Sequence, residues 1–200
     1  MTEPTILIVP GLRDDVPAHW QTLLAARLDR VRTVLPMGRA DLDCGARVEA
    51  IEREALAIDG PVIVVAHSGG VVMVAHWAMQ THRPVLGALL ATPPDFERPM
   101  PEGYPTIEEL REGGWLPVPR NRLPFPSIVA ASRNDPLGRF ERVAELAACW
   151  GGRLVDIGEV GHLNPASGYG EWPDAETFID ELKGARGETP HAGLTVGVSK

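Results

Sequence analysis

Short runs of apolar, largely β-branched residues recur along this chain, and residues that interrupt regular structure close them. The first run, Thr5 to Val9, is stopped by Pro10 and Gly11. A continuous apolar run of this length is typical of a strand buried on both faces of a parallel sheet. Similar runs lie at Pro61 to Ala66, Leu86 to Ala91, Ser127 to Ser132 and Arg153 to Ile157, with a weaker one at Val31 to Leu35. The sequence therefore predicts a mostly parallel sheet of about six strands.

Segments with the spacing of amphipathic helices lie between these runs. In Ala46 to Ile58, apolar residues recur every three or four positions, and the charged residues between them face water. Comparable patterns cover His19 to Leu28, Gly70 to Gln80, Phe140 to Trp150 and Ala175 to Leu182. Alternating strands and helices give a three-layer α/β/α sandwich whose ligand site lies at the carboxyl ends of the strands.

The composition fits one globular domain and excludes several kinds of partner. A chain of 200 residues with 44% hydrophobic and 23% charged residues has the size and balance of a single folded domain. Its net charge of −8 predicts no nucleic-acid or anionic-membrane partner. No apolar run approaches the roughly 20 residues that span a bilayer or the core of a signal peptide. Cys44 and Cys149 are the only cysteines and form no C-x-x-C motif, which fits a reducing compartment, so we expect a cytoplasmic protein. We expect it to be a monomer or a small homo-oligomer.

The segment from residue 92 to residue 126 breaks the alternation. It holds nine of the nineteen prolines, which fix φ and prevent long regular elements. One short helix is predicted, because Thr106 and Glu109 have the spacing of a capping box. We therefore expect a stiff loop over the site in place of a large cap, within a single domain of residues 1–183. Residues 184–200 lack periodicity and are expected to form a flexible tail.

The strongest local motif follows the strand predicted at Pro61 to Ala66. Ala66-His67-Ser68-Gly69-Gly70 leads directly into a helical pattern, which is the arrangement of a nucleophile elbow with alanine in place of the first glycine. The sharp turn exposes the Ser68 hydroxyl above the sheet and aims the Gly69 amide at a developing oxyanion. A second oxyanion donor is expected in the loop after the first strand, where the Leu12 amide is the candidate.

A serine nucleophile needs a histidine base and a carboxylate that orients it. In this architecture the chain order is serine, acid, histidine, and His162 follows the last predicted strand. Asp135 follows the strand before it, and the alternative Asp156 lies inside the last strand. We therefore predict the triad Ser68, Asp135 and His162. No metal-ligand spacing is present, and neither a metal nor another cofactor is expected.

Together these residues resemble the small serine hydrolases typified by retinoblastoma-binding protein 9, a compact branch of the α/β-hydrolase superfamily. The resemblance covers most of residues 5 to 182, departs from the family at Ala66 and Gly69, and implies the same triad on an α/β-hydrolase fold without a large cap. Besides the elbow, it rests on Val9-Pro10-Gly11, His19-Trp20-Gln21, Leu123 to Ser127, Asn134-Asp135-Pro136, Gly161 to Asn164 and Gly170 to Pro173.

The predicted activity is hydrolysis of a small-molecule acyl substrate, with a carboxylesterase on short-acyl esters as the first choice. Amidase, aminopeptidase and thioesterase activities use the same site and stay open, as does a protein-binding module on a hydrolase scaffold. The short connecting segment predicts a shallow acyl pocket. Trp20 and Trp172 are candidates for lining it.

Overall fold

A six-stranded sheet, parallel throughout, forms the centre of the molecule in the computed structural model, which describes residues 2–13 and 16–184. The strand order is β2-β1-β3-β4-β5-β6, and every neighbouring pair is parallel. All carboxyl ends therefore meet at one edge of the sheet. The strands are β1 (Thr5–Val9), β2 (Val31–Thr33), β3 (Val62–His67), β4 (Gly87–Ala91), β5 (Ser127–Ala131) and β6 (Arg153–Asp156).

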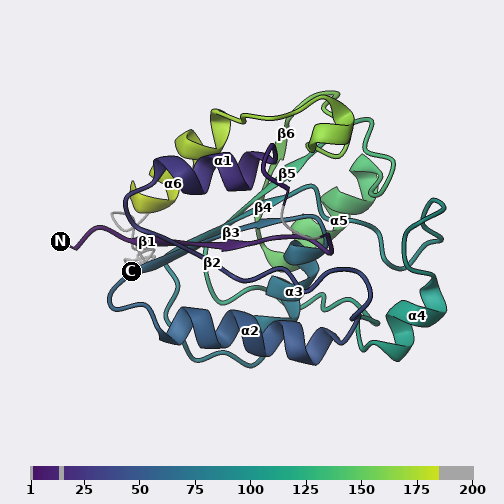
Figure 1. Cartoon of the computed structure of the whole chain (residues 1–200), viewed down its shortest axis with the longest axis horizontal. Coiled ribbons are helices and arrows are strands. Elements are labelled where there is room, and N and C mark those ends of the chain that lie inside the picture. The colour runs from purple at the N-terminus through teal and green to yellow at the C-terminus, as the bar shows by residue number, and fades with distance from the viewer. Residues whose placement is uncertain (1, 14–15, 185–200) are drawn as a thin grey trace, which may run out of the picture.

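Helices cover both faces of this sheet, as Figure 1 shows, with α1 and α6 on one side and α2 and α3 on the other. The residues of α5 pack into the same apolar layer as those of α2 and α3. The helices are α1 (Trp20–Arg27), α2 (Cys44–Leu56), α3 (Gly69–Trp77), α4 (Ile107–Glu112), α5 (Phe140–Trp150) and α6 (Asp174–Gly184), with a 3-10 turn at Pro165–Ser167.

The two apolar layers follow from the alternation of side chains along each strand. Leu7 and Val64 face the layer of α2, α3 and α5, whereas Ile8 and Val65 face the layer of α1 and α6. Strands β1, β3, β4 and β5 are buried along their whole length, which explains why their sequences are apolar without alternation. The predicted three-layer fold with six strands is confirmed, and each predicted helix and strand is present.

The proline-rich segment 92–126 divides into two parts in the structure. Its first part, through Pro94, Phe96, Met100 and Tyr104, lines the cavity at the carboxyl edge of the sheet. Its second part packs against the core, where Trp115 is fully buried, and carries α4 with the expected capping box. Only the first part thus lies over the cavity. The expected tail lies outside the described residues from 185 onward, and Gly184 is the last residue of α6.

No helix within residues 2–13 and 16–184 has the length and apolar character needed to cross a membrane.

Candidate active site

The turn between β3 and α3 places Ser68 in a strained backbone conformation. Its φ of 57° and ψ of −133° are unusual for a residue with a side chain, and such strain concentrates at functional sites. The turn depends on close approach of the backbone, because a Cβ on Gly70 would lie 2.5 Å from the carbonyl oxygens of Val9 and Pro10. Ser68 itself is half-buried and lines the cavity. The sharp strand-to-helix turn predicted from the motif is therefore present.

Three side chains from three strand ends meet at this turn. The Nε2 atom of His162 lies 2.7 Å from the Ser68 Oγ atom. The Nδ1 atom of His162 lies 2.8 Å from Oδ2 and 3.0 Å from Oδ1 of Asp135. The side chains of Asp135 and His162 are only 1% and 5% exposed, so the carboxylate and the imidazole meet away from bulk water. This geometry allows the imidazole to accept the hydroxyl proton while the carboxylate fixes the opposite nitrogen as a donor.

The alternative acid, Asp156, is placed elsewhere. Its carboxylate accepts a hydrogen bond of 2.7 Å from Nε of Arg133 and another from the Gly158 amide. The Arg133 hydrogen bond holds the pKa of Asp156 below its usual range. The position of Asp156 at the end of β6 directs it to the surface, so Asp135 is the acid that contacts His162.

The two amides expected to bind an oxyanion lie on segments that converge on Ser68. A Cβ on Gly11 would lie 3.1 Å from the Ser68 Cβ, and a Cβ on Gly69 would lie 2.9 Å from Leu12 Cγ. The missing side chain at position 69 therefore leaves room for the Leu12 side chain. Within residues 2–13 and 16–184, neither the Leu12 amide nor the Gly69 amide donates to a protein acceptor. By these distances, the Gly11–Leu12 segment and Gly69 pack closely beside Ser68.

His67, to which the sequence patterns assign no role, supports the catalytic histidine candidate. It is fully buried, and its Nε2–H donates to the His162 carbonyl oxygen over 2.9 Å. Burial, together with the neighbouring His162 and His19, lowers the pKa of His67 well below its usual range, so it stays neutral. Its ring also packs 4.7 Å from that of His19 and 5.0 Å from that of His162. The sequence shows a histidine next to Ser68, but it does not indicate that this side chain is buried against His162.

A cavity of about 430 Å³ opens at Ser68. Pockets for small molecules span roughly 300–1,000 Å³, so this volume suits a small-molecule ligand, and the expected shallowness of the acyl pocket stays a prediction. Its lining includes Leu12, Phe96 and Met100 around Ser68 and His162.

Trp20 and Trp172 do not line the cavity, which corrects the sequence-based prediction. They are 1% and 6% exposed and pack edge to face, with ring centroids 4.9 Å apart, in the layer of α1 and α6. His19, which caps α1, lines the cavity instead. The cause is the direction of the first turn of α1, which turns Trp20 toward the core and leaves His19 at the carboxyl edge of the sheet.

The sheet, the elbow and the serine, histidine and aspartate cluster define an α/β-hydrolase. Residues 6–181 match the model of the family described as serine hydrolase, and the chain belongs to that family. A YdeN-like hydrolase from Pectobacterium atrosepticum shares 28% identity and a TM-score of 0.78, with 92% of each chain covered.

More distant solved structures share the fold. The ydeN gene product of B. subtilis is 16% identical with a TM-score of 0.66, covering 91% of this chain and all of its own. A thermophilic esterase from Thermogutta terrifontis is 17% identical with a TM-score of 0.59, covering 94% of this chain and 92% of its own. No curated protein sequence matches the chain. Residues 2–13 and 16–184 contain no group of three or more histidine, cysteine, aspartate or glutamate side chains arranged to hold a metal ion.

Proposed function

We propose that the protein is a carboxylesterase for small esters, in which Ser68 is the nucleophile, His162 the general base and acid, and Asp135 the orienting carboxylate. The observation that carries this proposal is the unbroken contact from Ser68 Oγ through His162 to the Asp135 carboxylate. A serine hydroxyl is a weak nucleophile unless a base within about 2.6–3.2 Å removes its proton.

The reaction proceeds through an acyl-enzyme. Ser68 Oγ forms a bond to the acyl carbon while its proton moves to Nε2 of His162, and the carbonyl electron pair moves onto oxygen. The amides of Leu12 and Gly69 stabilise this oxyanion. When the oxyanion collapses, the bond to the alcohol oxygen breaks and His162 returns the proton to the leaving alcohol. Water, deprotonated by His162, then releases the carboxylic acid and restores Ser68.

Amide, aminoacyl and thioester substrates pass through the same kind of intermediate, and they form the alternative within the enzyme class. The resemblance to the retinoblastoma-binding protein 9 group rests on the residues around Ser68, Asp135 and His162. It does not indicate whether an alcohol, an amine or a thiol leaves the acyl carbon. Esters are preferred to amides because an alkoxide is a better leaving group than an amide anion, so ester cleavage demands less of His162 as an acid. A thiolate leaves still more readily, so thioesters are tested beside the esters. The cavity volume and its apolar wall suit a small-molecule substrate.

The test is a panel of 4-nitrophenyl esters from acetate to octanoate, an acyl thioester and aminoacyl 4-nitroanilides. We expect ester turnover by the wild-type protein, greatest for short acyl chains, and a fall of roughly 10⁴-fold or more in Ser68→Ala. Turnover of the anilides or the thioester above the esters would replace the esterase proposal by the corresponding alternative. Turnover of no acyl compound would favour a binding role on a hydrolase scaffold.

A further inference from the structure

The cavity at Ser68 carries positive charge on its wall, although the whole chain carries a net charge of −8. Arg13 and Arg39 line it, and no aspartate or glutamate does so among the described residues. Arg13 follows β1, and Arg39 lies between β2 and α2, so both come from loops at the carboxyl edge of the sheet. A cavity with this lining favours an anionic ligand.

Arg39 has unused hydrogen-bonding capacity beside this cavity. Its Nη1 atom donates to the carbonyl oxygen of Gly103. Its Nε and Nη2 atoms are buried and have no hydrogen-bond partner. The Tyr104 ring packs against the guanidinium, with the guanidinium carbon 4.4 Å from the ring centroid. Buried hydrogen-bond donors without a partner are unfavourable, so these two atoms lack an acceptor.

The two unpaired atoms form the edge of a guanidinium that suits a carboxylate, since Nε–H and Nη2–H point the same way. Within the described residues, Arg32 and Arg133 each use that edge on a single carboxylate. Nε and Nη2 of Arg32 lie 3.1 and 2.6 Å from Oε2 of Glu54. Nε and Nη2 of Arg133 lie 2.7 and 2.6 Å from Oδ2 of Asp156. Arg39 presents the same edge without a carboxylate.

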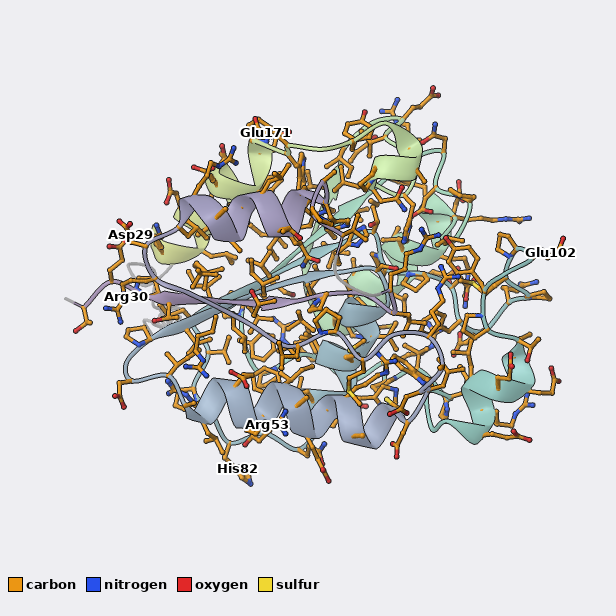
Figure 2. All side chains as sticks on the ribbon, in the orientation of Figure 1. Asp29, Arg30, Arg53, His82, Glu102 and Glu171 are labelled. Carbon is orange, nitrogen blue, oxygen red and sulfur yellow. The ribbon has the colours of Figure 1, made fainter. Side chains whose placement is uncertain are left out.

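The acidic residues of the loop that carries Tyr104 are engaged elsewhere. Asp95 accepts from Nε of Arg142 over 2.9 Å, and Glu97 pairs with both Arg142 and Arg120. Glu102, at the tip of this loop, points away from the body of the molecule in Figure 2. This loop therefore supplies no carboxylate to the cavity wall.

Two further carboxylates lie close to Arg39 along the chain, and both serve α2. Asp43 caps that helix by accepting from the Ala46 amide over 3.0 Å. The Asp41 carboxylate accepts from the Asp43 amide over 3.0 Å. Neither carboxylate pairs with Arg39, whose Nε and Nη2 atoms stay without a partner in the described part of the chain.

We propose that Arg39 binds a carboxylate of the substrate through Nε and Nη2, so that the preferred substrates are half-esters of dicarboxylic acids or related acyl compounds with a distal carboxylate. This inference rests on the proposed function and names its substrate class. Leu12, Phe96 and Met100 give the cavity an apolar wall, which suits a methylene chain between the scissile carbonyl and the carboxylate.

Tyr104 links the two arginines of the cavity wall. Its hydroxyl accepts a hydrogen bond of 3.3 Å from Nη2 of Arg13, and its ring packs on Arg39. The Nε and Nη2 atoms of Arg39 are closed off from solvent, so a carboxylate would reach them only after a side-chain rearrangement at this wall, where the Tyr104 ring is the group packed on the guanidinium. Arg13 then provides a second positive charge at the mouth of the cavity.

The test compares 4-nitrophenyl half-esters of adipic, pimelic and suberic acids with neutral 4-nitrophenyl esters of the same chain lengths. We expect at least one half-ester to have a higher kcat/KM than its neutral counterpart. In Arg39→Gln the ratio of the two kcat/KM values should fall at least tenfold, mainly through KM, and Arg39→Lys should retain part of it. Arg32→Gln, which removes an arginine that binds Glu54 outside the cavity, is the matched control and should keep the wild-type ratio.

A binding measurement separates this inference from the proposed function. Free adipate should raise the melting temperature of the wild-type protein but not of Arg39→Gln, and 1,6-hexanediol should raise neither. Hydrolysis of neutral esters without any preference for half-esters, together with no shift by adipate, would overturn the carboxylate site and leave the esterase proposal intact. Adipate binding that depends on Arg39, without turnover of any ester, would overturn the esterase proposal and support the carboxylate site.

Discussion

Gly70 is the position where a single methyl group should reveal how closely the elbow is packed. In Gly70→Ala the added Cβ would lie 2.5 Å from the carbonyl oxygens of Val9 and Pro10, whereas real Cβ contacts essentially never fall below 3.0 Å. Both neighbours are backbone atoms, so no side-chain rotation relieves the clash. The end of β1 and the first turn of α3 must therefore separate by about 0.5 Å or more.

The expected cost has a stability part and an activity part. Overpacking of this kind destabilises by about 1–3 kcal/mol, which lowers the urea midpoint by roughly 0.3–1.5 M for a slope of about 2–3 kcal/mol per M. The displacement also moves the loop that carries Leu12 relative to Ser68. Because a misplacement of about 1 Å can cost about 100-fold in rate, we expect kcat/KM to fall by about tenfold or more.

Urea unfolding followed by circular dichroism, and ester hydrolysis at fixed pH, measure the two effects. Gly170→Ala is the matched control, since the nearest heavy atom to its new Cβ would be 3.7 Å away. Its stability and activity should equal those of the wild type. A Gly70→Ala protein with the wild-type urea midpoint and the wild-type kcat/KM would refute the argument that this contact sets the elbow.

Three further perturbations test other parts of the site and fold. Asp135→Asn should lower kcat by about 10⁴-fold with little change in KM, because Asp135 acts on the reaction through Nδ1 of His162. A loss below about tenfold in steady-state kinetics would contradict that role. The pKa of His67 is depressed in the folded state, so its contribution to stability is complete above about pH 6.5 and is lost as the pH falls below that value. Between pH 8 and pH 5, the free energy of unfolding in urea should therefore fall less in His67→Gln than in the wild type. Equal falls in the two proteins would speak against a buried neutral histidine. Thr106→Ala removes the capping box that Thr106 shares with Glu109. It should lower the free energy of unfolding in urea by about 1 kcal/mol and leave kcat/KM unchanged. An unchanged urea midpoint would exclude a stabilising cap.

The sheet and its helices could be predicted from the sequence because their signals are local. The fully buried strands β1, β3, β4 and β5 read as continuous apolar runs, and the capping box at Thr106 marks the start of α4. The convergence of Ser68, Asp135 and His162 could be anticipated because each follows a strand of one parallel sheet. Their positions depend on topology more than on side-chain detail.

Contacts between loops were beyond the reach of the sequence patterns. Arg39 and Tyr104 lie 65 positions apart in segments without periodicity, and nothing local indicates that their side chains pack together. The same holds for Trp20, whose burial against Trp172 depends on the direction in which α1 leaves its cap. Side-chain direction at an element end is set by tertiary packing, so the proximity of Ser68, Asp135 and His162 could be predicted but the cavity wall could not.

The central claim is that Ser68 attacks an acyl or acyl-like centre with the help of His162. The most direct test is labelling with a fluorophosphonate, followed by peptide mass spectrometry to locate the adduct. We predict a single adduct on Ser68 in the wild type, none in Ser68→Ala, and labelling slowed by several orders of magnitude in His162→Gln. Equal labelling of Ser68→Ala, or an adduct on another residue, would contradict the claim.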